Sequence, residues 1–114
     1  MSQVVEDFDS NMYFGSADTY VYALRPDGQI MWKFKTGGAV ISTPVILEDT
    51  IYVGSWDHYI YAIDRRTGEV RWKFQTNNVV SSSPAISTNG IVFVGSGDSH
   101  LYALNLRNGE LLWS

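Results

Sequence analysis

One pattern of ten residues occurs three times along this chain of 114 residues. The copies begin at Gly15, Gly54 and Gly95 and end in Tyr-Ala-Leu or Tyr-Ala-Ile. After each copy comes a glycine and, four residues later, a tryptophan: Gly28 and Trp32, Gly68 and Trp72, Gly109 and Trp113. The tryptophans lie 40 and then 41 residues apart, so the chain is built from structural repeats of about 40 residues.

The second repeat indicates what one unit can form. It contains four short runs separated by turns, at residues 43–47, 51–54, 59–63 and 70–75. The run 51–54 has no polar alternation, which is typical of a strand buried on both faces. In the last run Val70, Trp72 and Phe74 alternate with polar residues, which predicts one buried side and one side in solvent. No part of the sequence has a sustained helical period.

Each repeat therefore predicts a four-stranded antiparallel meander, and a unit of this length and strand number is a β-propeller blade. We expect an all-β fold in which residues 1–114 form a single repeat domain. The three blades are expected at about residues 3–36, 42–76 and 82–114. The first blade has a weak innermost strand, because only Val4 and Val5 precede an acidic stretch.

The segment Tyr61–Trp72 reads Tyr-Ala-Ile, a polar turn, Thr-Gly-Glu, two residues and then Trp. This pattern resembles the repeat named after pyrroloquinoline quinone (PQQ) enzymes. The third copy, Tyr102–Trp113, keeps most of it, whereas the first has Pro26-Asp27-Gly28-Gln29 in its turn. The resemblance covers almost the whole chain after the first ten residues.

The resemblance implies that the tryptophan of each repeat docks on a neighbouring blade and that small residues make room for it. The implied positions are Trp32, Trp72, Trp113, Ala23, Ala62, Ala103, Gly28, Gly68 and Gly109. The regular spacing of the tryptophans favours this structural role over a stacking platform for a quinone, a sugar or a base.

Three blades are too few to close a propeller ring, which needs roughly four to eight blades. An open arc would leave an apolar blade face bare at each end, and exposed apolar surface of this size is unfavourable. Either the chain is a segment of a longer propeller, or copies join head to tail into a homo-oligomeric ring. Family propellers with seven or eight blades favour the first alternative, and we expect the isolated chain to self-associate.

Other candidate residues lie in the turns. Trp56 has no aromatic counterpart in the other repeats, so Trp56, with its neighbour His58, is the best candidate for contact with a protein partner. Asp18, Asp57 and Asp98 recur at one turn position, where capping of the turn is a better account than a shared metal. Neither His58 nor His100 has a nucleophile or a metal-ligand partner at a recognisable spacing.

Composition excludes several kinds of function. The chain has no cysteine, which excludes disulfides, thiolate catalysis and Cys-ligated metals. Its net charge of -4 disfavours nucleic-acid binding, because such binding depends on Lys and Arg at the phosphates. No apolar run is long enough for membrane insertion, and the N-terminal residues lack the features of a signal peptide. Members of the family that the chain resembles are often periplasmic or extracytoplasmic, and the compartment of this chain is left open.

Two functional classes follow. The first is a non-catalytic repeat segment that acts as a structural or protein-interaction scaffold, similar to the PQQ-repeat lipoproteins that help assemble outer-membrane proteins. The alternative is a fragment of a quinoprotein dehydrogenase dependent on PQQ and calcium. In that family the quinone lies beside adjacent cysteines, with carboxylate and amide ligands to calcium. This sequence has no such set, so we expect no catalytic residue, no metal and no cofactor.

Overall fold

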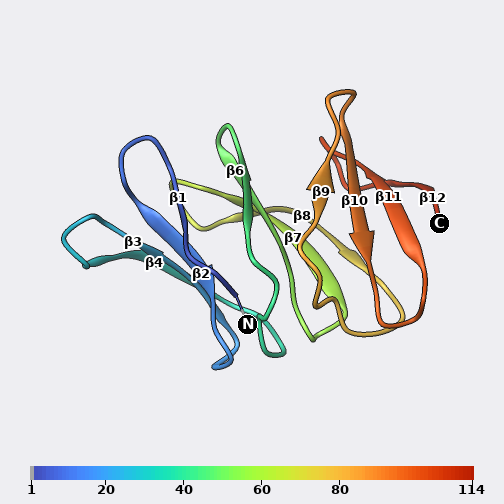
Figure 1. Cartoon of the computed structure of the whole chain (residues 1–114), viewed down its shortest axis with the longest axis horizontal. Helices are drawn as coiled ribbons and strands as arrows, with labels where there is room; N and C mark the ends of the chain where they lie inside the picture. The colour runs from blue at the N-terminus through green and yellow to red at the C-terminus, as the bar shows by residue number, and fades with distance from the viewer. Residues whose placement is uncertain (1) are drawn as a thin grey trace.

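The computed structural model describes residues 2–114, and these residues form three four-stranded antiparallel sheets and no helix (Figure 1). The first sheet contains β1 (Val5–Glu6), β2 (Met12–Gly15), β3 (Tyr20–Leu24) and β4 (Ile30–Lys35). The second contains β5 (Val45–Leu47), β6 (Thr50–Gly54), β7 (Tyr59–Asp64) and β8 (Val70–Gln75). The third contains β9 (Ala85–Ile86), β10 (Ile91–Gly95), β11 (Leu101–Asn105) and β12 (Leu111–Trp113). The predicted all-β fold of three four-stranded blades is confirmed.

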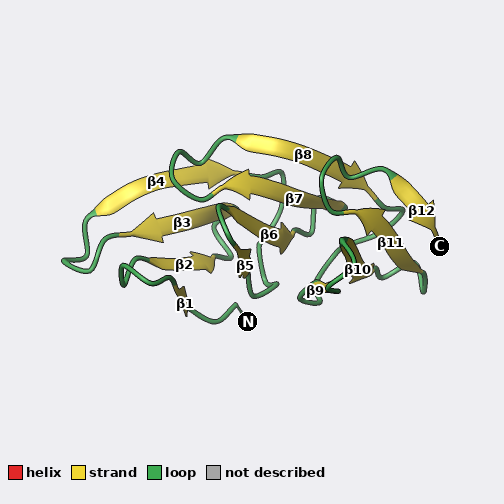
Figure 2. Cartoon of the chain, turned by 90° about the horizontal axis from the view of Figure 1, so that it is seen from above, coloured by secondary structure: helices red, strands yellow, loops and turns green. Residues whose placement is uncertain are grey.

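The strands of each sheet pair in chain order, so every blade is a simple meander. Figure 2 shows the three blades side by side along an arc, with β4, β8 and β12 on its outer edge. The innermost strands β1, β5 and β9 lie on the opposite edge. Because neighbouring strands run in opposite directions, the turns after innermost strands and those before outermost strands share one end of each blade. The remaining hairpins and the connections between blades lie at the other end.

The core lies between the sheets. One buried cluster joins blades 1 and 2 and includes Tyr13 and Trp32, and a second joins blades 2 and 3 and includes Trp72 and Leu104. All five residues of β6 are buried, whereas β2 and β10 alternate between buried and half-buried residues. The difference arises because blade 2 alone has a neighbour on both faces. The predicted burial of residues 51–54 on both faces is thereby confirmed.

The expectation that Val70 shares the buried side of Trp72 is wrong. A β-bulge interrupts the pairing of β7 with β8, so that Ala62 lies opposite Trp72 but Ile63 lies opposite Val70. The extra residue shifts Val70 to the other face of the sheet, where it is 38% exposed. The pairing of the two outermost strands is irregular at the same point in blades 1 and 3.

The innermost strand of blade 1 is as short as predicted but begins one residue later. It consists of Val5 and Glu6, while Val4 precedes it and is exposed. Only the two pairs Val5 with Tyr13 and Glu6 with Met12 hold it to β2.

Candidate functional site

The first seam is the contact of blades 1 and 2 around Trp32, Arg65 and Gly68. The indole Nε1 of Trp32 donates a hydrogen bond to the backbone oxygen of Arg65 over 2.8 Å. The ring lies against Gly68, where an added Cβ would come within 2.7 Å of the indole. Gly68 also has a φ of +79°, which favours glycine. Gly68 therefore meets two requirements at once: it leaves space for the indole ring, and it adopts a left-handed backbone conformation.

The second seam is the contact of blades 2 and 3 around Trp72, Leu106 and Gly109. Here Nε1 of Trp72 donates to the backbone oxygen of Leu106 over 3.0 Å. A Cβ on Gly109 would lie 2.4 Å from the indole, and the φ of this glycine is +75°. In both seams the acceptor is a main-chain carbonyl, so the residue that provides it is free to differ: it is arginine in one and leucine in the other.

The small residues of the repeat lie directly opposite the tryptophans. Ala23 pairs with Trp32, Ala62 with Trp72 and Ala103 with Trp113 in the strand register. All three alanines are fully buried. A larger side chain at these positions would displace the packing around the neighbouring ring.

The third tryptophan and the first turn glycine have different surroundings. Trp113 is 49% exposed, whereas Trp32 and Trp72 are 8% and 9% exposed. Within residues 2–114 no atom lies within 4 Å of a Cβ built on Gly28. Two tryptophan–glycine contacts are therefore complete, while Gly28, in the β3–β4 turn, and Trp113, on β12, belong to the blades at opposite ends of the arc (Figure 1). The docking role of these positions stays a prediction.

The recurrent aspartates cap their hairpin turns, as predicted. Oδ1 of Asp18, Asp57 and Asp98 accepts a hydrogen bond from the backbone N–H two residues later. A second contact was not predicted: Oδ2 of each accepts a hydrogen bond from the hydroxyl of a tyrosine four residues later. The bond from Tyr102 lowers the pKa of Asp98 to about 2. The repeated spacing of Asp and Tyr was the available signal.

Two of these aspartates also join neighbouring blades. Oδ2 of Asp57 accepts the N–H of Gly37, and Oδ2 of Asp98 accepts the N–H of Asn77. Both amides belong to the connections that lead from one blade to the next. Each aspartate is thus occupied at its own turn, and within the described chain no three His, Asp or Glu side chains gather where they could share a metal ion.

Two buried threonines, which the sequence analysis did not single out, form further contacts between blades. The hydroxyl of Thr36 lies 2.9 Å from that of Ser55, and the hydroxyl of Thr76 lies 3.0 Å from that of Ser96. Each threonine hydroxyl is also within hydrogen-bond distance of two backbone oxygens. Their 40-residue separation is the same repeat signal that marks the tryptophans.

Hydrogen bonds from backbone N–H groups to side-chain hydroxyls connect neighbouring blades at the inner edge of the arc. The N–H of Gln3 donates to Oγ1 of Thr43 over 2.9 Å, and the N–H of Thr43 donates to Oγ of Ser83 over 3.1 Å. The three positions are equivalent in the repeat, so the bonds form a chain from blade 1 to blade 3. These bonds and the seam contacts hold both edges of adjacent blades together.

Trp56 and His58 lie in the hairpin between β6 and β7. Trp56 is 48% exposed, as the sequence suggested, and its backbone N–H donates to the oxygen of Ala39. His58 is half-buried and has a φ of +80°, an unusual value that Thr19 and Ser99 share at the equivalent turn positions. The backbone here is therefore fixed by the hairpin. The role of the two side chains in binding a partner stays a prediction.

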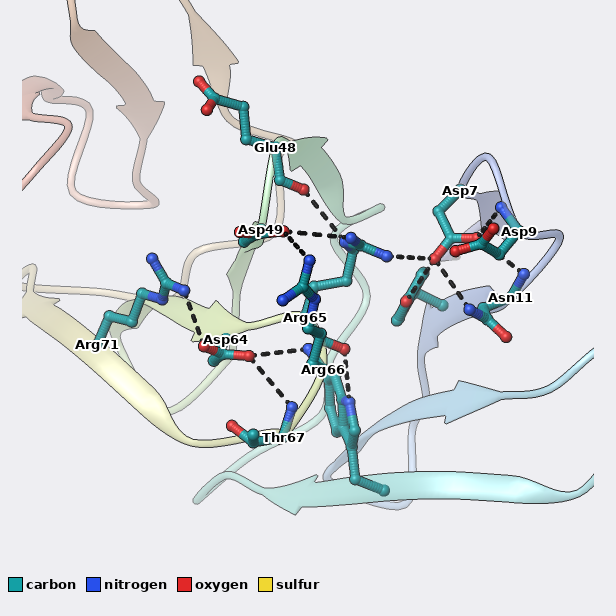
Figure 3. A network of polar contacts seen from close by, with 12 residues as sticks. Asp7, Asp9, Asn11, Glu48, Asp49, Asp64, Arg65, Arg66, Thr67 and Arg71 are labelled. Atoms are coloured by element: carbon teal, nitrogen blue, oxygen red, sulfur yellow. Dashed lines mark hydrogen bonds and ion pairs between the residues drawn. The ribbon is translucent and has the colours of Figure 1, made fainter.

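A polar cluster is confined to the first seam (Figure 3). Nη1 of Arg65 lies 2.6 Å from Oδ2 of Asp7, and Nη2 lies 3.3 Å from Oδ1 of Asp49. The hydroxyl of Tyr13 donates to the same Asp7 oxygen over 2.8 Å. Burial alone would raise the pKa of Asp7, but hydrogen bonds from Tyr13, Asn11 and Arg65 outweigh it and hold that pKa below its ordinary value. Asp7 and Arg65 are therefore a charged pair that joins two blades.

None of the described residues lies in a helix that could cross a membrane. His100 is mostly exposed, and its Nδ1 lies 3.5 Å from Oδ1 of Asp98. What the geometry offers is a set of surfaces through which blades contact one another.

The sequence of this chain matches a family model and part of one curated protein. A family model described as outer membrane protein assembly factor BamB matches residues 4–114. The uncharacterized protein YxaL of Bacillus subtilis (strain 168) is 40% identical over 53 residues, which are 42% of this chain and 13% of that protein.

Solved structures show the same fold at lower identity. BamB from Moraxella catarrhalis superposes with a TM-score of 0.85 at 20% identity, covering 98% of this chain and 34% of BamB. Quinohemoprotein alcohol dehydrogenases from Pseudomonas putida HK5 and Comamonas testosteroni give TM-scores of 0.86 and 0.87 at 24% and 21% identity. Each comparison covers 98% of this chain and 20% of the dehydrogenase. This chain thus spans about a third or less of these proteins, and it belongs to the PQQ-like repeat family of β-propeller proteins.

Proposed function

We propose that this chain is a non-catalytic propeller segment that acts as a structural and protein-interaction scaffold, and that its end blades pack on other copies head to tail. The observation that carries the proposal is the pair of half-contacts at the ends of the arc. Trp113 presents a half-exposed indole at one end, and Gly28 presents an open glycine turn at the other. The same two groups form a complete contact in each internal seam.

The acceptor needed by Trp113 is also present in blade 1. In the internal seams the carbonyl that accepts from the indole directly follows the residue that accepts the N–H of the turn glycine. Arg25 accepts the N–H of Gly28, so the equivalent carbonyl belongs to Pro26. No described residue donates to that oxygen. The blade 1 turn is one residue shorter than its counterparts, and a copy docked here would meet a slightly different surface.

The exposed apolar surface of blade 3 supports the same proposal. Leu101 is 49% exposed, whereas its counterparts in the repeat, Val21 and Ile60, are fully buried between blades. Burying such side chains against a partner stabilises an assembly by roughly 25 cal/mol for each Å² removed from water. In the proposed assembly Trp32 and Trp72 dock the blades of one chain, and Trp113 docks the next chain.

The experiment is a measurement of absolute mass by size-exclusion chromatography with light scattering over a series of protein concentrations. We expect a discrete multiple of 12.8 kDa. Trp113→Ala should lower the mass to that of the monomer, whereas Trp56→Ala, which removes an equally exposed tryptophan from a hairpin, should not. A monomer at every concentration, or the same mass for Trp113→Ala, would overturn the proposed assembly.

The alternative function is a fragment of a PQQ- and calcium-dependent quinoprotein dehydrogenase. Its support is the fold that the chain shares with two quinohemoprotein alcohol dehydrogenases. The side chains do not fit such a site: the sequence has no cysteine, and within residues 2–114 no three carboxylates converge on one point. Addition of PQQ with calcium discriminates the two functions. A saturable change in quinone absorbance or in melting temperature would favour the dehydrogenase fragment.

A further inference from the structure

The loop between β1 and β2, residues 7–11, is built differently from its counterparts. In blade 2 only Glu48 and Asp49 separate the two strands. The loop of blade 1 is longer, and the side chain of Asp7, which is 5% exposed, organises it. Oδ1 of Asp7 accepts the N–H groups of Asp9 and Asn11, each over 2.9 Å. Oδ2 is bound to Tyr13 and to Arg65 of the next blade, so the loop is anchored on both sides.

Phe8 lies at the tip of this anchored loop and is fully exposed. Beside it is a groove of about 540 Å³, which separates the loop from the β5–β6 turn. Phe8, Ile46 and Leu47 provide its apolar walls. An exposed aromatic ring on a fixed backbone next to an apolar hollow is the kind of surface that marks a protein-interaction site.

The rim of the groove carries the whole net charge of the chain. Five acidic residues line it, Glu6, Asp7, Asp9, Glu48 and Asp49. With the single cation Arg65 they give a charge of -4, which equals the charge of the chain, because the remaining seven acidic and seven basic residues balance. The excess of acidic over basic residues therefore lies at this groove and gives it a negative potential.

Only part of this charge is compensated within the molecule. Arg65 pairs with Asp7 and Asp49, and Arg66 also reaches Asp49. Among the residues that the structure describes, no cationic side chain pairs with Glu6, Asp9 or Glu48. In Figure 3 the carboxylate of Glu48 points away from Arg65, to which this residue offers only its backbone oxygen.

We propose that this groove binds a partner protein through an extended segment in which basic side chains alternate with apolar ones. The apolar side chains would cover Phe8, Ile46 and Leu47, and the basic ones would pair with the uncompensated carboxylates on the rim. A nucleic acid is repelled by the same charge. The inference rests on the proposed scaffold function, for which it names a binding surface and the chemistry of the partner.

The second seam provides an internal contrast. The hollow at the equivalent place, between blades 2 and 3, is lined by Arg71 and Arg107 as well as by Glu48 and Asp49. Its opposite charges balance, and no exposed aromatic residue stands beside it. A cationic segment is therefore expected to choose the first groove over the second.

The test is a titration with the synthetic peptide Leu-Lys-Phe-Lys-Leu, capped at both ends, followed by amide chemical shifts of the ¹⁵N-labelled chain. We expect saturable shifts around the loop 7–11 and the turn at Glu48. Raising the salt from about 50 mM to about 300 mM should weaken binding, because exposed charges are screened. A peptide with glutamate in place of both lysines should not bind, and one with serine in place of the apolar residues should bind more weakly.

Variants of the chain localise the effect. Phe8→Ala and Asp9→Asn should each weaken binding by roughly fivefold, as truncation of a central contact does, and both residues line the first groove and not the second. Ile30→Ala and Glu69→Gln are matched controls, since they remove another exposed apolar side chain and another carboxylate, and they should leave the affinity unchanged. All four side chains lie outside the buried clusters, and thermal melts verify that the variants fold.

Three results would overturn the inference: no saturable shifts, equal binding by the lysine and glutamate peptides, or equal affinity of Phe8→Ala and the unaltered chain. Shifts confined to Leu111–Trp113 would instead indicate that the peptide covers the exposed face of blade 3. The mass of the protein is measured separately, so failure of the proposed self-association is distinguishable from failure of this groove to bind.

Discussion

The two seams share a tryptophan contact but differ in the side chains beside the residue that accepts its hydrogen bond. In both, an indole N–H donates to a main-chain oxygen and the ring covers a glycine with positive φ. The first seam adds the charged cluster of Asp7, Tyr13 and Arg65, whereas the second has Leu47 and Leu106 packed against its buried cluster. The shared contact uses the backbone oxygen of the acceptor residue. The side chain of that residue can therefore differ between the seams while the contact is kept.

The two seams also differ in what their side chains contribute to the stability of the chain and to the binding surface. A partly buried ion pair contributes little net stability compared with well-packed apolar residues, although removal of one partner is costly. The apolar second seam therefore represents the simpler solution to joining two blades. The charged first seam fixes a loop that the second seam lacks, and it is this loop that carries Phe8.

The largest expected effect tests what the seams share. Trp72→Ala should lower the free energy of unfolding by about 3–5 kcal/mol, because it removes a large buried ring and leaves a cavity. Trp32→Ala should cost a similar amount despite its charged surroundings. Urea unfolding followed by circular dichroism measures both. An unchanged midpoint for either variant would contradict the docking role of its tryptophan.

The next largest effect tests the charged pair of Asp7 and Arg65, which is present in the first seam only. Asp7→Asn should destabilise the chain by about 3 kcal/mol, because it leaves the Arg65 guanidinium beside a neutral partner in a poorly hydrated place. The double variant Asp7→Asn with Arg65→Leu should recover part of this loss, since leucine occupies the equivalent position in the second seam. If the double variant is no more stable than Asp7→Asn, the two seams are not interchangeable in this respect.

A smaller effect measures how tightly the ring covers the glycine. Gly109→Ala should cost about 1–3 kcal/mol more than Gly90→Ala, because only the first places a methyl group against an indole. Both glycines have positive φ, at +75° and +85°, so the backbone cost is matched. Equal losses of stability in the two variants would show that the ring can move aside.

The charged pair of Asp7 and Arg65 in the first seam should also make the stability depend on acid. The pKa of Asp7 is lowered from its ordinary 3.8, so its ionised form stabilises the fold above that pH, and this contribution is lost as the pH falls below about 3.8. The double variant Asp7→Asn with Arg65→Leu should therefore lose less stability than the unaltered chain between neutral pH and the acid range. Unfolding midpoints at several pH values test this, and parallel curves would contradict it.

The smallest expected effect concerns Trp56. Replacement by alanine should change the free energy of unfolding by less than about 0.5 kcal/mol, because half of the side chain is exposed and its turn is held by backbone bonds. Thermal unfolding checks it beside Trp32→Ala. A loss as large as that of Trp32 would mean that Trp56 belongs to the core of the first seam.

Most of the fold could be predicted from the sequence because its determinants are local and periodic. The strands follow from apolar runs between turn residues, and the blade follows from the 40-residue repeat. The bulge before each tryptophan could not be found in this way. It depends on how the outermost strand pairs with its neighbour, and it moved Val70 to the opposite face from the one expected.

The residues of the candidate site also fall into two groups, those that the repeat reveals and those that only the structure brings together. The positions of Trp32 and Gly68 stand out as members of a repeat, whereas Asp7 and Arg65 are unique residues 58 positions apart with no spacing that connects them. Their pairing depends on the rotation of one blade relative to the next, and so does the groove beside Phe8.

The sequence by itself determined the repeat, the strands and the residues that recur at equivalent positions, because backbone hydrogen bonding and side-chain alternation act over a few residues. The tertiary structure alone decided which side chains meet across blades, where the net charge collects and which end groups remain exposed. These outcomes depend on distances between separate sheets, and such distances are set by packing rather than by any local pattern.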